Sequence, residues 1–144
     1  MSKEENVAAQ SIGGEIAVSH DWERFDEVMA QGVVDHDAAA DQPAGVEGIK
    51  QYWRQLAESF PDFKLDVDVL LADDEYVTLA YRLSGTHRGF FMGHAPTGKR
   101  FEVRSLQVGR FENGLMVERW GATDLLGILM QLDLERGQDV VAVP

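Results

Sequence analysis

The clearest pattern in the sequence is a change of hydrophobic period at Pro61. Before it, apolar residues recur three or four positions apart, at Val46, Ile49, Trp53, Leu56 and Phe60. That spacing places them on one face of a helix, and a proline at the next position ends a helix. The sequence therefore predicts a helix over residues 46–60 with one buried face.

After Pro61, apolar and polar residues alternate, which is typical of half-buried antiparallel strands. The two alternating runs contain Phe63, Leu65, Val67, Val69 and Leu71, and then Val77, Leu79, Tyr81 and Leu83. Two more strands are expected over residues 99–112 and 115–123, joined by a hairpin turn at Asn113-Gly114. A Gly-rich connection over residues 85–98 precedes them. Together these runs predict a four-stranded antiparallel meander.

Weaker patterns flank this meander on both sides. Residues 5–19 are expected to form a helix, although Gly13 and Gly14 each weaken it by about 1 kcal/mol. Asp21 is a plausible N-cap for a short second helix, which Gly32 ends before a short strand over residues 33–36. A closing amphipathic helix is expected from Leu125 to near Gly137.

The order of these elements predicts the fold class. Helices come first, strands follow and one helix closes the chain, so the class is α+β rather than α/β. Helices packed on one face of a strongly curved antiparallel sheet would form a cone with an open mouth. Residues 1–144 are expected to form one domain with a core at about 5–136, and the tail 137–144 is expected to be mobile or at an interface.

Composition and charge exclude several functions. The 144 residues hold 13 Lys and Arg against 25 Asp and Glu, so the formal charge is 13 − 25 = −12. This charge opposes nucleic-acid phosphates and anionic membranes. The absence of Cys excludes disulfides and thiolate metal sites. With no apolar targeting segment, the expected location is cytoplasmic.

Asp124 is the first candidate for chemistry. On a regular strand, Glu118, Trp120, Ala122 and Asp124 share one face, and we expect Trp120 and Asp124 to face the mouth of the pocket. An aspartate beside an aromatic wall is partly desolvated, which raises its pKa and makes it a better proton acceptor. The alternative is structural, because Asp124 also stands where the N-cap of the last helix belongs.

Other polar residues stand where apolar ones are expected. Ser105 and Gln107 fall in the inward phase of the third meander strand, where they would need a ligand, water or other partner. The alternative is a bulge that shifts the phase and turns Leu106 inward. His36 and His87 end strands, where each could donate a hydrogen bond to a substrate oxygen or simply be satisfied within the protein.

Three further groups of residues are assigned from their positions. Phe90, Phe91 and Met92 lie on the Gly-rich connection and could form a lid, a pocket wall or an interface. Arg104 and Arg119 are expected on a solvated or interfacial face. No metal site is expected, because adjacent residues such as those of Asp35-His36-Asp37 point to opposite faces of a strand.

Several short segments, taken in order, are typical of one protein family. They are Val34-Asp35-His36-Asp37, Gly45-Val46-Glu47-Gly48-Ile49-Lys50, Phe60-Pro61-Asp62-Phe63, Gly85-Thr86-His87-Arg88-Gly89 with the residues to Lys99, and Asn113-Gly114 with Glu118 to Gly127. On these segments the chain resembles the SnoaL-like polyketide cyclases, or ester cyclases, of the nuclear-transport-factor-2-like superfamily. The sequence departs from the family at Arg119, where the family commonly has His, and at Ala95-Pro96.

The resemblance implies a fold: a cone-shaped α+β barrel in which a curved antiparallel sheet wraps around the N-terminal helices, with an interior apolar pocket. It also implies a function. Family members close the last ring of aromatic polyketides by intramolecular aldol condensation, need no metal or cofactor, and are homodimers or homotetramers. It implies that Asp124 is the acid/base residue. His36, His87 and Gln107 would then steady oxygens that gain charge, while Trp53, Tyr81, Phe91 and Trp120 would form flat apolar walls.

The sequence therefore predicts a cofactor-independent enzyme that acts on a small apolar carbonyl compound. One alternative is another reaction of the superfamily, such as isomerisation, dehydration or epoxide hydrolysis. Epoxide hydrolysis in that superfamily uses an Asp-Arg-Asp set, and dehydration uses paired His with Asp. The other alternative is a non-catalytic module that binds small molecules.

Overall fold

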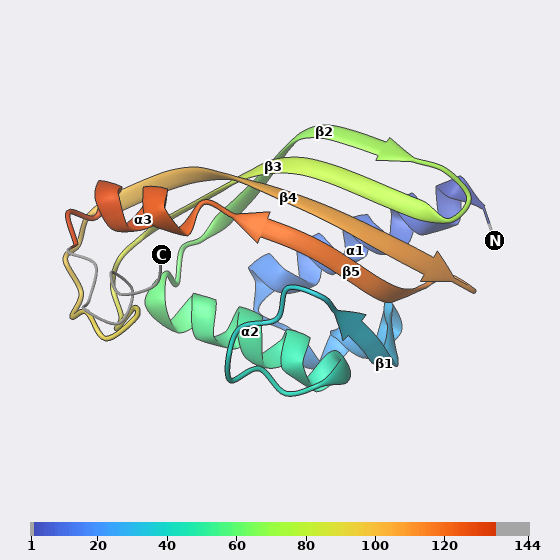
Figure 1. Cartoon of the computed structure of the whole chain (residues 1–144), viewed down its shortest axis with the longest axis horizontal. Helices are drawn as coiled ribbons and strands as arrows, with labels where there is room; N and C mark the ends of the chain where they lie inside the picture. The colour runs from blue at the N-terminus through green and yellow to red at the C-terminus, as the bar shows by residue number, and fades with distance from the viewer. Residues whose placement is uncertain (1, 135–144) are drawn as a thin grey trace.

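The computed structural model shows a curved five-stranded sheet with two long helices on its concave side (Figure 1). The structure describes residues 2–134. The strand order is β1-β5-β4-β3-β2, so β1 (Met29–Asp35) and β2 (Lys64–Ala72) are the two edges. The α+β class and the curved sheet over N-terminal helices are confirmed, and the sheet stays open between β1 and β2 rather than closing on itself.

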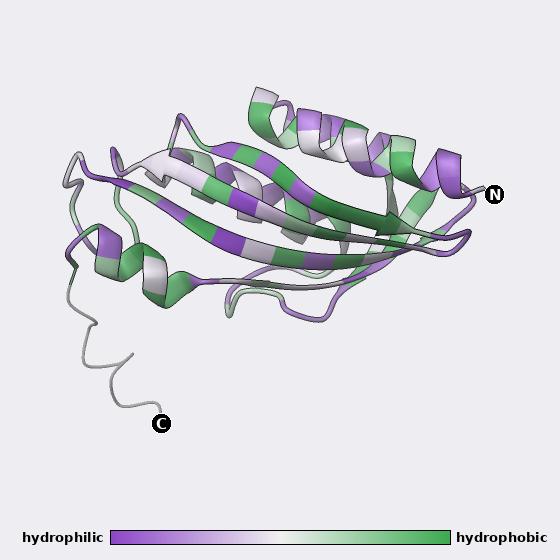
Figure 2. Cartoon of the chain, turned by 90° about the horizontal axis from the view of Figure 1, so that it is seen from above, coloured by the Kyte–Doolittle hydropathy of each residue, from purple (hydrophilic) through white to green (hydrophobic). Residues whose placement is uncertain are grey.

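The four-stranded meander is confirmed. Strands β2, β3 (Tyr76–Thr86), β4 (Arg100–Glu112) and β5 (Leu115–Thr123) pair antiparallel in sequence order. Figure 2 shows the alternation of apolar and polar residues as green and purple bands along the strands. The fifth strand, β1, pairs in parallel with β5, and Asp35 lies in register with Arg119. This pairing joins the N-terminal part of the chain to the last strand.

The two long helices contact different parts of the molecule. Helix α1 (Lys3–Ser19) begins at Ser2, whose Oγ accepts a hydrogen bond from the Glu5 amide at 3.1 Å, and it packs against β2 and β3. Helix α2 (Gly45–Ser59) buries Val46 and Ile49 and packs mainly against β1 and the 3₁₀ helix η1 (Trp22–Glu27). Most of the concave face opposite α2 is therefore left open.

Two expectations for the segment between these helices are wrong. Asp21 stands at the N-cap position of a short helix, the 3₁₀ helix η1, but its side chain makes no capping hydrogen bond. Gly32, expected to end that helix, lies inside β1, which starts four residues earlier than the predicted residue 33, at Met29. A strand of this length lets β1 pair with β5, and the parallel pairing outweighs the local helical pattern.

The strict alternation predicted along β2 is also wrong. The register shifts between Val67 and Val69, so Val67 pairs with Tyr81 while Leu70 pairs with Leu79. The extra residue is a β-bulge, which reverses the phase of the strand. Leu70 therefore shares the concave face with Leu79, and Val69 turns to the outside, where it is 50% exposed.

The last helix is shorter than predicted. Helix α3 spans Leu125–Gln131, whereas the sequence placed its end near Gly137. Leu132 follows α3 and is fully buried in the core, together with Ile16, Phe25 and Phe60. Residue 137 and the tail that follows lie outside the described residues. Within residues 2–134, no helix is long and apolar enough to cross a membrane.

Candidate active site

A large cavity lies between the concave face of the sheet and helix α2. Its volume is about 730 Å³, within the range of small-molecule sites. Apolar walls come from α2, β3, α3 and the connection after β3, and they include Ile49, Trp53, Leu83, Phe91 and Ile128. The polar residues of the lining include Asp35 of β1 and Arg119 of β5, where the two strands pair in parallel.

Arg119 is the central polar group of this cavity. Its Nη1 lies 2.6 Å from Oδ1 of Asp35, and its Nε donates to Oε1 of Gln107 at 3.1 Å. Asp35 also accepts from Nε2 of Gln42 at 2.9 Å through its other oxygen. The Asp35 and Arg119 side chains are 9% and 18% exposed, so they form a largely buried ion pair. Such a pair is retained only where further hydrogen bonds satisfy both groups.

A glycine two residues after Arg119 leaves space for its guanidinium. Gly121 follows Arg119 in the inward phase of β5, and a Cβ there would collide with Nη2 of Arg119. The glycine therefore lets the guanidinium lie flat along the strand, where it reaches both Asp35 and Gln107.

Tyr52 of α2 adds a phenol to the same cavity. Burial, with smaller contributions from Tyr81 and Asp35, raises the pKa of Tyr52 to about 12, and nearby Arg119 opposes the rise. An ordinary tyrosine titrates near 10, so Tyr52 is a neutral hydrogen-bond donor at physiological pH. The site thus presents a fixed cation and a neutral donor to any oxygen that enters it.

Several predicted binding residues do line this cavity. They are Trp53, Tyr81, Phe91, Met92 and Gln107. Ser105 also faces inward, but it is 1% exposed, bonds Oγ1 of Thr123 at 2.7 Å and lies outside the lining. Leu106 is 58% exposed on the opposite face, so the proposed phase-shifting bulge in this strand is wrong.

Asp124 does not face the cavity. Its Oδ1 accepts a hydrogen bond from the amide of Gly127 at 2.9 Å, it is exposed, and it is absent from the cavity lining. A Cβ at Gly127 would clash with the Asp124 carboxylate, so the glycine makes room for this cap. The structure therefore shows the capping geometry that was the alternative interpretation of Asp124.

Trp120 and His36 lie on the outer face of the sheet, so their predicted orientation toward the pocket is wrong. Trp120 pairs with Val108, which has the outward phase of β4, and the ring of His36 stacks on it at 4.7 Å. Nε2 of His36 lies 2.6 Å from Oε2 of Glu118. Glu118 shares this outer face with Trp120, as expected, but the face points away from the cavity.

His87 is buried behind the cavity wall. It is 0% exposed, and its Nδ1 accepts from the Thr97 amide at 3.2 Å. Because Nδ1 is an acceptor, the proton of the neutral ring belongs on Nε2. Among the described residues Nε2 has no hydrogen-bond partner, and the ring packs against Phe60 and Phe91. His87 is therefore not in reach of the cavity as it stands.

Three of the site's polar residues, Arg119, Asp35 and Tyr52, differ from what the sequence predicts. Arg119 was assigned to a solvated or interfacial face, which is wrong, whereas Arg104 is exposed as expected. For Asp35 the sequence suggests at most a metal ligand, and for Tyr52 it indicates no role. The alternation along the strand, which places Arg119 and Gly121 on the same face, could have indicated that Arg119 points inward. Its partner Asp35 lies 84 residues away in the sequence, so no local pattern connects the two.

The comparisons with known proteins agree with this architecture. The family model of SnoaL-like polyketide cyclases matches residues 9–132. IdmH from Streptomyces antibioticus, a candidate polyketide cyclase, is 32% identical with a TM-score of 0.74, and the match covers 87% of this chain and 97% of IdmH. AclR from Streptomyces galilaeus, a candidate hydroxylase, is 25% identical with a TM-score of 0.75, over 97% of this chain and 88% of AclR.

TsrD from Streptomyces laurentii has the same fold at lower sequence identity. It is 22% identical with a TM-score of 0.83, and the match covers 92% of this chain and 97% of TsrD. No curated protein matches the sequence.

Proposed function

The chain belongs to the SnoaL-like polyketide cyclase family, and on that premise we propose that it catalyses an acid/base reaction on a small carbonyl compound without a cofactor. The reaction is an intramolecular aldol-type ring closure of an aromatic, polyketide-like substrate. The observation that carries the proposal is the Asp35–Arg119–Gln107 group beside neutral Tyr52 in an apolar cavity.

Asp35 is the proton acceptor in this proposal. A carbon flanked by an ester and an aromatic ketone loses a proton readily because its anion is delocalised. Asp35 lines the cavity with its carboxylate held by Arg119 and Gln42, whereas Asp124 lies outside the lining and caps a helix. The role that the family resemblance implied for Asp124 therefore passes to Asp35.

Arg119 and Tyr52 stabilise the oxygens that gain charge. When Asp35 removes the proton, the electron pair of the C–H bond moves toward the neighbouring carbonyl oxygen. The carbanion then attacks the substrate's ketone carbon, a C–C bond forms, and the ketone π electrons pass to its oxygen. Protonated Asp35 returns the proton to this alkoxide. Fixed donors aimed at such oxygens lower the barrier because they need no reorganisation.

Epoxide hydrolysis is not favoured by the site. In that superfamily reaction, an arginine stands between two aspartates. Here the second partner of Arg119 is Gln107 instead, and Asp37 accepts from the Gly121 amide at 2.8 Å. A non-catalytic binding module remains the competing function, and the experiment below distinguishes it.

The proposal can be tested before the substrate is known. An aromatic ketone with an ester-activated methylene group is incubated with the protein in D₂O, and exchange of the methylene protons is followed by NMR. The wild type should accelerate exchange, and Asp35→Asn should reduce the acceleration at least about 10²-fold. Arg119→Gln and Tyr52→Phe should also reduce it, while Asp124→Asn should not.

Two outcomes would contradict the proposal. A probe that binds in the cavity without faster exchange would indicate a binding module. Full exchange activity in a folded Asp35→Asn variant would exclude Asp35 as the base. Thermal unfolding of each variant separates loss of the site from loss of the fold.

A further inference from the structure

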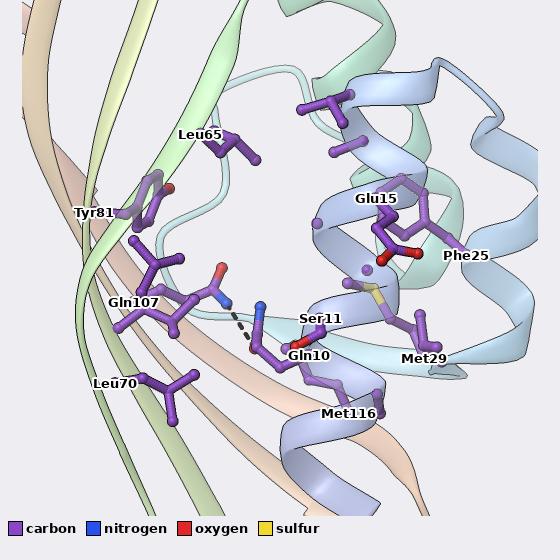
Figure 3. A pocket seen from close by; sticks show the side chains of 18 of the residues that line it. Gln10, Ser11, Glu15, Phe25, Met29, Leu65, Leu70, Tyr81, Gln107 and Met116 are labelled. Atoms are coloured by element: carbon purple, nitrogen blue, oxygen red, sulfur yellow. Dashed lines mark hydrogen bonds between the residues drawn. The ribbon is translucent and has the colours of Figure 1, made fainter.

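A second cavity lies between helix α1 and the sheet, next to the cavity that holds Arg119 (Figure 3). Its volume is about 340 Å³. Close-packed protein interiors contain few voids larger than a water molecule, and a space of this size reaches the range of ligand sites. It is therefore too large to be a packing defect.

The side of α1 that faces the sheet creates this space. Of the α1 residues that line it, four have no side chain beyond Cβ: Ala9, Gly13, Gly14 and Ala17. The remaining lining residues of this helix are Gln10, Ser11, Glu15 and Val18. A Cβ at Gly14 would meet no atom within 4 Å, and one at Gly13 would meet only Val28, at 3.9 Å. Neither glycine has a positive φ. Both glycines weaken the helix, and the backbone conformation requires neither of them. Their effect is to leave space between α1 and the sheet.

The lining indicates which chemistry the cavity accepts. Phe25, Leu65, Leu79 and Met116 are among its apolar walls, and among the described residues that line it Glu15 alone is charged. A carboxylate in the lining disfavours an anionic ligand. Two other lining residues, Val67 and Leu70, are 54% and 37% exposed on the edge strand β2, so the cavity reaches the surface there.

The two cavities share a wall. Met29, Trp53, Tyr81 and Gln107 line both of them. Nε2 of Gln107 donates to Oε1 of Gln10 at 3.3 Å, and Figure 3 shows this hydrogen bond between the sheet and α1. The other end of Gln107 accepts from Arg119 at 3.1 Å. The partition thus consists of side chains, and its polar member is joined directly to the proposed catalytic group.

We propose that the second cavity is the tail compartment of the active site. It binds the uncharged hydrocarbon part of an elongated substrate whose carbonyl end lies beside Arg119, and this assignment rests on the proposed function. The Gln107 side chain lies between the polar end and the apolar tail of the bound substrate. Its amide gives up the hydrogen bond to Gln10 when a tail occupies the second cavity.

The test is the chain-length dependence of ligand binding. Binding of straight-chain methyl ketones, from pentanone to undecanone, is measured by NMR titration. Each methylene group that becomes buried should raise the affinity about fourfold. Gly14→Leu places a side chain in the compartment, so the increase of affinity with chain length should stop at a shorter ketone than in the wild type. Pentanone, which is too short to reach the compartment, should bind to both proteins equally. Ala8→Leu adds the same side chain to the exposed side of α1 and is the matched control.

The outcomes separate the tail compartment from the proposed function. Equal chain-length dependence in Gly14→Leu and Ala8→Leu would overturn the compartment, as would a wild type whose affinity does not rise with length. If Gly14→Leu does not fold, Gly14→Ala improves the helix and should still weaken the longest ketones severalfold. Unchanged proton exchange in Asp35→Asn, with chain-length dependence intact, would refute the function but not the compartment.

Discussion

At the scale of single residues, the site depends on an arginine that the strand turns inward. Arg119 reaches Asp35 and Gln107 only because Gly121 leaves space beside its guanidinium. Gly121→Ala should therefore displace the guanidinium, which is the mobile partner in the clash, without unfolding the sheet.

We expect Gly121→Ala to lower proton-exchange activity at least about tenfold, since small misplacements of a catalytic group cost about that much or more. Gly32→Ala is the control, because a Cβ at Gly32 meets nothing within 4 Å. The rates are compared in the D₂O exchange experiment, with thermal unfolding measured in parallel. Equal rates for the two variants would show that the position of Arg119 is not critical.

Asp124 allows a second prediction at this scale. Its carboxylate caps α3, and asparagine caps helices about as well as aspartate. Asp124→Asn should therefore keep both stability and activity, whereas Asp124→Ala should lower the free energy of unfolding by about 1 kcal/mol. Chemical denaturation measures the difference. A loss of exchange activity of about 10²-fold in Asp124→Asn would instead restore Asp124 as the acid/base residue.

The sequence determined which residues share a face better than which face is buried. Alternation correctly grouped Glu118 with Trp120, yet the group lies outside, because phase alone does not give direction. Arg119 lies on the face opposite to Glu118 and Trp120. Without knowledge of its partner, alternation alone does not show that this face is the inner one. Asp35 lies 84 residues earlier and meets it only through the parallel pairing of β1 with β5, which no local pattern encodes.

At the scale of elements, the docking of η1 on α2 depends on one buried lysine. Nζ of Lys50, whose side chain is 2% exposed, lies within 3.2 Å of carboxylate oxygens of Glu23, Asp26 and Glu47. Burial by itself would lower the pKa of Lys50, but the hydrogen bonds to these carboxylates outweigh it, so the pKa lies above its ordinary value.

Lys50→Met should lower the free energy of unfolding at pH 7 by about 1–2 kcal/mol, the scale of hydrogen bonds to charged groups. The carboxylates are exposed and stay hydrated, which limits the loss. Because the folded pKa is raised, the contribution is complete below the unfolded pKa of about 10.4 and disappears as the pH rises through the folded value.

Denaturation at pH 7 and at a series of pH values above ~10.4 tests this sign, since the difference in stability between wild type and Lys50→Met should stay constant below ~10.4 and shrink as the pH rises beyond it. Arg24→Met is the control: Arg24 pairs with Glu27 on the surface at 3.1 Å and should change stability little. A difference that persists unchanged at high pH would show that Lys50 acts through its apolar stem.

Elements with a clear period of apolar residues were predictable from the sequence. Features that depend on pairing with strands distant in the sequence were not. The helix over 46–60 and the four meander strands follow from local patterns and are confirmed, with ends that differ from the prediction by at most three residues. The bulge in β2 and the extension of β1 depend on partners elsewhere in the sheet. The cavity arises from the same cause, because its polar residues come from β1, α2, β4 and β5.

At the scale of the whole molecule, the outer face of the sheet carries two apolar rows. Register places Val69, Ala80, Leu106 and Ala122 side by side across β2 to β5, and Leu71, Thr78, Val108 and Trp120 in the next row. Leu71 is 66% exposed and Leu106 is 58% exposed. A contiguous exposed apolar surface of this kind marks an interaction site.

We expect this face to pair two copies of the chain as a homodimer, or as the unit of a homotetramer. The net charge of −12 opposes association, but the charges beside the rows are internally paired, with Arg82 on Asp68 and Arg110 on Glu118. Leu106→Glu would place a carboxylate at the centre of the rows and should shift the protein toward monomer in sedimentation velocity. Met130→Glu, at a position 69% exposed on α3, should leave the assembly unchanged. Leu106→Glu should act in this way because an unpaired carboxylate is not tolerated at the centre of an apolar contact. A wild type that is monomeric at high concentration, or the same association state in both variants, would contradict this interface.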